Sequence, residues 1–123
     1  MTITAIPSRT GIPLMGGYGV AMAAKESLTR RLSVGLAPHG IWVLGLRPQA
    51  MPETPTIRDA YEPRAKASGM TSEQWQEALA AKTLTKRLMS LDEMSNIAVY
   101  MASDMASGMT GTTVNLTMGS LDD

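Results

Sequence analysis

Apolar residues in the first half of the chain occur in two kinds of pattern. Residues 2–6 are short, β-branched and apolar, and residues 41–46 form a continuous apolar run. Both patterns are typical of buried strands, and the continuous run favours a parallel sheet covered by helices on both faces. Between them, from Tyr18 to Ala37, apolar residues recur every three or four positions without a proline, which predicts a helix. One face of this helix carries Ala21, Ala24, Leu28, Leu32 and Leu36.

Glycine and proline separate these elements. Residues 7–17 and 48–55 contain several of both and are predicted to be loops, and Pro38-His39-Gly40 is expected to end the helix. A strand, a helix and a second strand in this order form a right-handed crossover.

The second half of the chain is predicted to be helical until its last strand. Short helices are expected over residues 57–68 and 72–82, and a longer helix from Ser90 to about Ser103. Residues 112–116 form the last predicted strand. Two capping boxes mark the starts of the last two predicted helices. Thr71 with Gln74 begins the helix over residues 72–82, and Ser90 with Glu93 begins the longer helix that follows.

The order of these elements predicts an α/β fold with about three parallel strands and flanking helices in three layers. A chain of 123 residues with 44% hydrophobic residues suits a single domain. Both edges of such a small sheet would be free, and an exposed apolar edge recruits another chain.

Composition excludes several classes of function. The chain has no cysteine and one histidine, His39, so neither a disulfide framework nor a zinc site is expected, and no metal is predicted. No apolar stretch of about 20 residues predicts a membrane span, so no membrane partner is expected. The first residues lack the basic region of a signal peptide, which predicts a cytoplasmic protein.

The net charge of zero conceals an asymmetry along the chain. Residues 1–52 carry five basic residues and one acidic residue, whereas residues 88–123 carry five acidic residues and no basic one. A balanced chain is not expected to bind nucleic acid, because neutralising phosphates needs a surplus of Lys and Arg. The basic first part leaves two interpretations open, a small phosphorylated ligand or a solvated helix face.

Tyr18 is the first candidate for chemistry. It lies between a predicted loop and a helix, just beyond the carboxyl end of a predicted strand, where ligands of open α/β sheets bind. A phenol with an ordinary pKa of about 10 needs a nearby cation to transfer protons near neutral pH. The position one helical turn further on is occupied by Met22.

Two longer segments match a known pattern. Tyr18 is followed, at matching spacing and without gaps, by Leu-Ala-Pro-His-Gly-Ile-Trp-Val at residues 36–43, and residues 101–111 read Met-Ala-Ser-Asp-Met-Ala-Ser-Gly-Met-Thr-Gly. Both segments resemble the C-terminal half of the short-chain dehydrogenase/reductase family, and the resemblance covers residues 18–120. It implies that residues 1–123 form the C-terminal half of a Rossmann-like domain, with residues 55–88 as a lid-like helical insertion. It also implies NAD or NADP as cofactor, and hydride transfer to a carbonyl or from an alcohol.

The resemblance assigns roles to individual residues. In the family a tyrosine transfers the substrate proton, a lysine four residues on lowers its pKa and holds the ribose, and a serine polarises the carbonyl. Tyr18 corresponds to the tyrosine, but Met22 occupies the lysine position and Ala5 the serine position. Thr4 is expected to point to the opposite face of the strand from Ala5. Ser8 could replace the missing hydroxyl only if its loop folds back.

The expected cofactor positions are also altered. The family's Pro-Gly-x-x-x-Thr after the second strand corresponds to Pro48 through Thr54, with the threonine one residue late. The resemblance implies cofactor contacts by Pro48, Ala50, Met51 and Thr54. Gln49 replaces the glycine, which hinders a close backbone approach. No Gly-x-Gly-x-x-Gly turn follows the early strand, and the glycines at 11, 16, 17 and 19 are interpreted as turn residues.

The sequence therefore predicts a short-chain oxidoreductase relative that is inactive or weakly active as this isolated chain. The alternatives are a non-catalytic assembly module or a gene remnant. Such a module would form homo-oligomers or pair with a separate N-terminal half, and the family places the helix over residues 18–37 at a subunit interface. Tyr61 and Trp75 either line a pocket for an apolar substrate or pack within the helical insertion.

Overall fold

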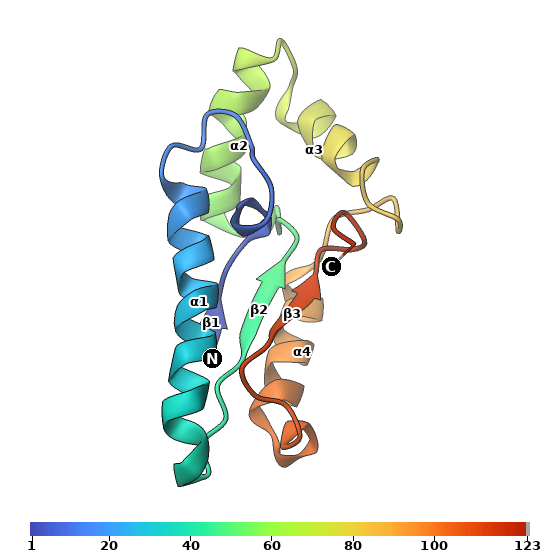
Figure 1. Cartoon of the computed structure of the whole chain (residues 1–123). Coiled ribbons are helices and arrows are strands. Elements are labelled where there is room, and N and C mark those ends of the chain that lie inside the picture. Colours follow the sequence, from blue (N-terminus) through green and yellow to red (C-terminus); the bar gives the residue numbers. More distant parts are fainter. Residues whose placement is uncertain (123) are drawn as a thin grey trace.

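A three-stranded parallel sheet forms the centre of the molecule (Figure 1). The computed structural model describes residues 1–122. Strands β1 (Thr2–Ile3), β2 (Gly45–Pro48) and β3 (Thr113–Leu116) lie in the order β1-β2-β3. Thr2 and Thr113 both pair with Gly45 in the parallel register. The predicted α/β class with three parallel strands is confirmed.

The strands are shorter than predicted or displaced. β1 ends at Ile3 because a 3-10 turn, η1 (Ile6–Ser8), begins soon afterwards with Pro7 in its first positions. β2 begins only at Gly45, so the prediction of a strand over 41–46 was wrong for residues 41–44. A strand begins where its backbone pairs with that of its neighbours in the sheet. A run of apolar residues does not indicate where this pairing begins.

Helices account for most of the remaining chain. α1 (Tyr18–Leu36) ends in a second 3-10 turn, η2 (Ala37–His39), closed by Gly40 at a φ of +71°. α2 (Pro55–Ala67) begins at Pro55 rather than at 57, because proline suits the first turn of a helix. The others are α3 (Ser72–Ala80), α4 (Leu91–Ala102) and the turn η3 (Asp104–Ala106). Both predicted capping boxes, at Thr71 and Ser90, are present and start α3 and α4.

The sheet has an apolar face under α4. Side chains alternate along a strand, so Leu46 of β2 points to one side and Arg47 to the other. Leu46 is completely buried and packs in one cluster with the α4 residues Met94 and Met101. This cluster, which also includes Leu44 and Met89, is the hydrophobic core of the molecule.

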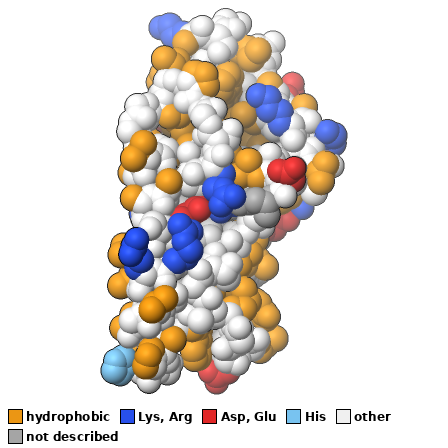
Figure 2. Space-filling view, viewed as in Figure 1, with side chains coloured by type: hydrophobic (Ala, Val, Ile, Leu, Met, Phe, Trp, Pro, Cys, Tyr) orange, Lys and Arg blue, Asp and Glu red, His pale blue; other side chains and the backbone are white. Residues whose placement is uncertain are grey.

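The sheet face under α1 is polar. The buried residues of α1 are Glu26, Thr29 and Ser33, and the Thr29 hydroxyl lies 2.6 Å from that of Thr2 in β1. The helix approaches the loop before β3 closely, since a Cβ on Gly111 would lie 2.7 Å from the Ser33 hydroxyl. The repeated apolar positions of α1 consequently point away from the sheet. Four of these residues are exposed: Ala21, Ala24, Leu28 and Leu32. Figure 2 shows hydrophobic side chains along the left edge of the molecule, where α1 lies.

Candidate functional site

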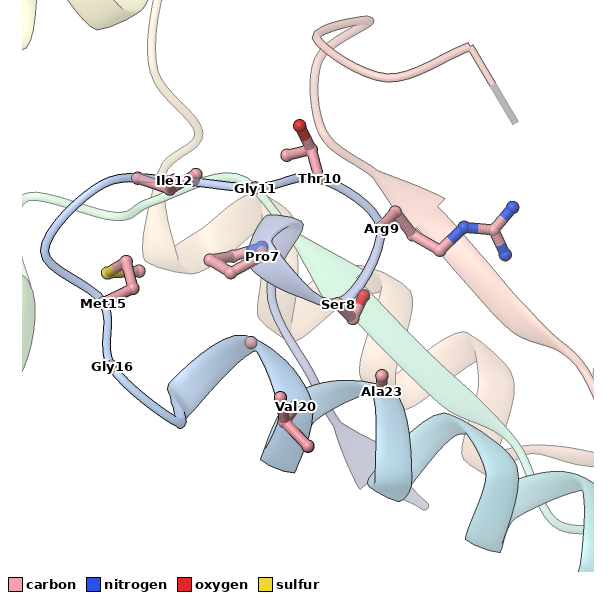
Figure 3. Close-up of a pocket in the computed structure, with 11 residues that line it drawn as sticks. Pro7, Ser8, Arg9, Thr10, Gly11, Ile12, Met15, Gly16, Val20 and Ala23 are labelled. Atoms are coloured by element: carbon pink, nitrogen blue, oxygen red, sulfur yellow. The ribbon is translucent and has the colours of Figure 1, made fainter.

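A groove of about 430 Å³ lies beside the start of α1 (Figure 3). Its walls are the η1 turn, the loop that follows and the first turns of α1. Gly19 permits this packing, because a Cβ there would lie 2.7 Å from the Pro7 carbonyl oxygen. The lining residues include Ser8, Arg9, Thr10, Met15 and Val20. Tyr18 is not among them, and its side chain is 45% exposed.

The Ser8 hydroxyl is hydrogen-bonded to a buried ion pair below the groove. Its hydroxyl donates to Glu26 Oε1 at 2.5 Å, and Arg47 donates to the same carboxylate through Nε at 2.8 Å and Nη2 at 3.1 Å. Thr4 adds a longer hydrogen bond of 3.2 Å. Glu26 and Arg47 are 3% and 2% exposed. The network joins η1, α1 and β2, so the Ser8 hydroxyl is used in holding the fold together.

The charge state of Glu26 follows from these contacts. Burial by itself raises the pKa of the carboxyl, but the hydrogen bonds from Arg47 and Ser8 and the Arg47 charge act more strongly in the other direction. The pKa of Glu26 therefore ends below its ordinary value. A carboxylate of lowered pKa is a weak base, which argues against Glu26 activating Ser8 as a nucleophile.

At the positions that the resemblance assigns around Tyr18, the side chains lack the groups that the family pattern calls for. Met22, one turn along α1, is partly buried and has a thioether where a cation would be needed. Ala5, immediately before η1, has no hydroxyl. The predicted substitute Ser8 bonds Glu26.

The loop after β2 satisfies its own polar groups. The Thr54 hydroxyl donates to the Met51 carbonyl at 2.9 Å, and the Ala50 amide donates to Gln49 Oε1 at 2.9 Å. Gln49 is 6% exposed and donates through Nε2 to Ser120 at 2.7 Å. The groups expected to contact a nicotinamide are thus engaged within the chain, and a buried side chain occupies the glycine position. A dinucleotide could use these groups only after their internal hydrogen bonds are broken.

The sequence interpretation missed the residues that organise this region. Glu26 is the single acidic residue before residue 53, on a helix whose other charged residues are basic, and this isolation was the available signal. Gln49 was recognised as a departure from the family pattern, but its partner Ser120 is distant in sequence. Neither contact has a local sequence signature, because both join elements that meet only after folding.

The helical insertion buries two polar atoms without partners. Tyr61 in α2 is 4% exposed, and neither its hydroxyl nor Trp75 Nε1 in α3 has a hydrogen-bond partner among the described residues. Burial raises the pKa of Tyr61 to about 12, although the nearby charge of Arg64 opposes the shift. Neither aromatic residue lines the groove beside α1 or the hollow formed by Met1, Trp42, Leu44, Met101 and Ala102. These facts favour packing over pocket lining.

Replacing Tyr61 with phenylalanine is expected to leave the free energy of unfolding unchanged or to raise it by about 1 kcal/mol, because a buried hydroxyl without a partner has lost its hydration. Urea denaturation followed by circular dichroism would measure the change. Tyr100→Phe is the matched control, since Tyr100 is 40% exposed and should shift stability by less than about 0.5 kcal/mol. A loss above about 1 kcal/mol in Tyr61→Phe would show that the hydroxyl is hydrogen-bonded.

Other kinds of site find no support in residues 1–122. No helix in this range has the length and hydrophobicity that a membrane crossing requires. The same residues contain no group of three or more acidic, histidine or cysteine side chains arranged to hold a metal ion.

Comparisons with known proteins agree on one family. Residues 1–120 match a family model described as enoyl-(acyl carrier protein) reductase. A sorbitol-6-phosphate 2-dehydrogenase from Klebsiella pneumoniae is 32% identical over 104 residues, which are 83% of this chain and 39% of that protein. A D-beta-hydroxybutyrate dehydrogenase from Rhizobium meliloti is 27% identical over 108 residues, 87% of this chain and 42% of that protein.

Solved structures show the same relationship. The sorbitol-6-phosphate 2-dehydrogenase of Erwinia amylovora superposes with a TM-score of 0.90 at 26% identity, covering 98% of this chain and 47% of that one. An NADPH-dependent reductase involved in bacilysin biosynthesis gives 0.86 at 26% identity, covering 98% and 46%. The chain spans between 32% and 42% of the length of the curated relatives that it matches.

Proposed function

This chain belongs to the short-chain dehydrogenase/reductase family of oxidoreductases, and we propose that it corresponds to the C-terminal half of such an enzyme and has little or no dehydrogenase activity by itself. The family's reaction is hydride transfer between NAD or NADP and a carbonyl or alcohol. The observation that carries the proposal is the loop after β2. In that loop the buried Gln49 side chain stands at the position of the family's glycine and donates to Ser120. The Thr54 hydroxyl, which the resemblance assigns to the cofactor, donates instead to the Met51 carbonyl.

The residues around Tyr18 support the same proposal. A phenol transfers protons at neutral pH when a cation lowers its pKa, and the side chain one turn along is Met22. Ala5 cannot donate a hydrogen bond to a carbonyl through its side chain, and the Ser8 hydroxyl already donates to Glu26. No proton step in this chain is therefore assigned to Tyr18.

The proposal predicts that the isolated chain shows no saturable binding of NADH or NADPH at micromolar concentrations. Nicotinamide fluorescence and titration calorimetry would measure it. Turnover would be assayed with D-beta-hydroxybutyrate and sorbitol 6-phosphate, the compounds after which two relatives are named. Micromolar binding of either cofactor would contradict the proposal.

The variant Met22→Lys tests whether the missing lysine alone accounts for the expected lack of dehydrogenase activity. It restores the cation position but leaves Gln49 and Thr54 engaged, so turnover is expected to stay at background. Met70→Lys, on the exposed Met70, is a control for the added charge. Measurable activity in Met22→Lys would show that the loop after β2 opens to admit the cofactor.

A second candidate function is that of a non-catalytic assembly module. Met1 and Ile3, at the edge of the sheet, are each 53% exposed, and in the described residues β1 pairs only with β2. A hollow of about 220 Å³ beside this edge reaches the core residues Leu44 and Met101. An open strand beside an apolar hollow suits a further strand, from a second copy or a separate N-terminal half. Light scattering tests this candidate, and a monomer at high concentration would count against it.

A further inference from the structure

The side chain of Gln49 is hydrogen-bonded at both ends of its carboxamide group. Its oxygen, Oε1, accepts from the Ala50 backbone amide at 2.9 Å, and its nitrogen, Nε2, donates to the Ser120 hydroxyl at 2.7 Å. Gln49 is buried, and burying an amide costs free energy unless its polar atoms find partners. Ala50 and Ser120 supply those partners.

The loop after β3 fixes the Ser120 hydroxyl and its direction. This hydroxyl donates to the Thr117 carbonyl at 2.5 Å, and the Ser120 backbone amide donates to the same carbonyl at 3.0 Å. Thr117 is buried, and its own amide and hydroxyl donate to Asn115 Oδ1 at 3.0 Å and 2.6 Å. A hydroxyl has one hydrogen, and Thr117 takes that of Ser120. Toward Gln49, Ser120 therefore presents an acceptor.

The Ala50 amide and the Ser120 hydroxyl together select one chemical group. The amide N–H can only donate, and the hydroxyl oxygen accepts. A primary carboxamide, which has a carbonyl oxygen beside an NH₂ group, complements both. A carboxylate would place an oxygen with lone pairs against the Ser120 oxygen, and an apolar group would leave both positions unpaired at a cost. The pair therefore favours a primary carboxamide over groups of the same size.

The cofactor that the family resemblance implies carries the same group, since the nicotinamide ring of NAD and NADP bears a primary carboxamide. The family pattern has glycine at position 49, and a glycine has no side chain to bond Ala50 or Ser120. In this chain Gln49 supplies a carboxamide from within the protein. Its backbone amide donates to the Leu116 carbonyl at 2.9 Å, where β2 and β3 end. Ligands of open parallel sheets bind at such carboxyl ends.

We propose that Ala50 and Ser120 form a site for a primary carboxamide and that Gln49 occupies this site as an internal ligand. The inference rests on the proposed function above, in which groups of the loop after β2 are engaged within the chain, and it names the group that occupies them. While Gln49 keeps both bonds, a free carboxamide is excluded. Removing the Gln49 carboxamide opens the site to a small molecule that carries the same group.

Rescue by acetamide tests the proposal. Gln49→Ala keeps Cβ and leaves a cavity that acetamide, the missing part of the side chain, matches in shape. Acetamide at about 100 mM is expected to raise the melting temperature of Gln49→Ala by about 3 °C, because a ligand that binds the folded state stabilises it. It should not raise that of the wild type, whose site is filled. Acetate, which has the shape of acetamide, and N,N-dimethylacetamide, which has no N–H, should raise neither.

Hydrogen exchange of the Ala50 amide, followed by NMR, gives a second readout. Exchange is expected to be about tenfold faster in Gln49→Ala than in the wild type, and acetamide should slow it again. Gln49→Met is the matched control: it fills a similar volume without either hydrogen bond, so exchange should be faster and acetamide should not slow it. Gln76→Ala, on α3, should respond to none of the three probes.

The outcomes separate this inference from the proposed function. If acetamide does not stabilise Gln49→Ala, or acetate stabilises it equally, there is no carboxamide site, and the proposed function still stands. Unchanged exchange of the Ala50 amide in Gln49→Met would lead to the same conclusion, even if Gln49→Ala does not fold. Micromolar binding of NADH by the wild-type chain would instead overturn both.

Discussion

Replacing Glu26 with glutamine is expected to lower the free energy of unfolding by about 3–5 kcal/mol, a large fraction of the roughly 5–15 kcal/mol typical of a domain. Glutamine has nearly the same shape but no charge. It would leave the Arg47 guanidinium, 2% exposed, without its carboxylate at 2.8 Å. The loss would come mainly from removing the negative charge that faces this buried cation.

Urea denaturation would measure the change, with Glu62→Gln on the exposed side of α2 as the control. The control should change stability by less than about 0.5 kcal/mol. Replacing both members of the pair, Glu26→Leu with Arg47→Met, should cost less than Glu26→Gln alone, because no charge remains buried. A loss below about 1 kcal/mol in Glu26→Gln would show that water reaches the pair.

The same carboxylate gives stability a defined dependence on pH. Since the folded pKa of Glu26 lies below its ordinary value of 4.5, its contribution is present above pH 4.5 and is lost as pH falls through the lower folded value. The difference in stability between wild type and Glu26→Gln should therefore shrink as the pH drops below 4.5.

Leu46→Ala is expected to lower the free energy of unfolding by about 2–5 kcal/mol, the range for removing a fully buried leucine side chain. Leu46 has no exposed surface and packs where β2 meets Met94 and Met101 of α4. The three-stranded sheet has this single apolar face, so a cavity there weakens the attachment of α4 to the strands. Methionines can move to fill part of the space, which favours the lower part of the range.

Thermal and urea unfolding would measure this loss, and Leu14→Ala is its matched control. Leu14 is 81% exposed, so its truncation should change stability by less than about 0.5 kcal/mol. A cost below about 1 kcal/mol for Leu46→Ala would mean that the core between β2 and α4 is loosely packed.

Local sequence signals predicted the starts of three helices but not the bounds of the strands. The capping boxes at Thr71 and Ser90 start α3 and α4 as expected, and α1 begins at the predicted Tyr18. Such signals depend on hydrogen bonds between residues three or four positions apart. The family resemblance carried by residues 18–120 agrees with the family model match. The assignment of Tyr18, Met22 and Ala5 to family positions remains a prediction.

The orientation of α1 could not be predicted from its own pattern. Periodicity located an apolar face at Ala21, Ala24, Leu28 and Leu32, but the structure turns that face outward. Glu26 and Thr29 point inward, because Ser8 and Arg47 bond the Glu26 carboxylate and Thr2 bonds the Thr29 hydroxyl. Ser33 is buried on the same side, and its hydroxyl donates to the Arg30 carbonyl of its own helix. A helix buries the side that its neighbours can complement, and those neighbours are distant in sequence.

The sequence by itself determined the order of helices and strands and the family, because each depends on residue identity and local spacing. The departures at Met22, Ala5 and Gln49 stay predictions from that sequence. The tertiary structure alone decided that the Ser8 hydroxyl bonds Glu26, that Gln49 reaches Ser120, and that α1 presents an apolar, basic face outward. These outcomes depend on which groups meet after the chain folds, and burial favours hydrogen bonds between the polar groups that meet there.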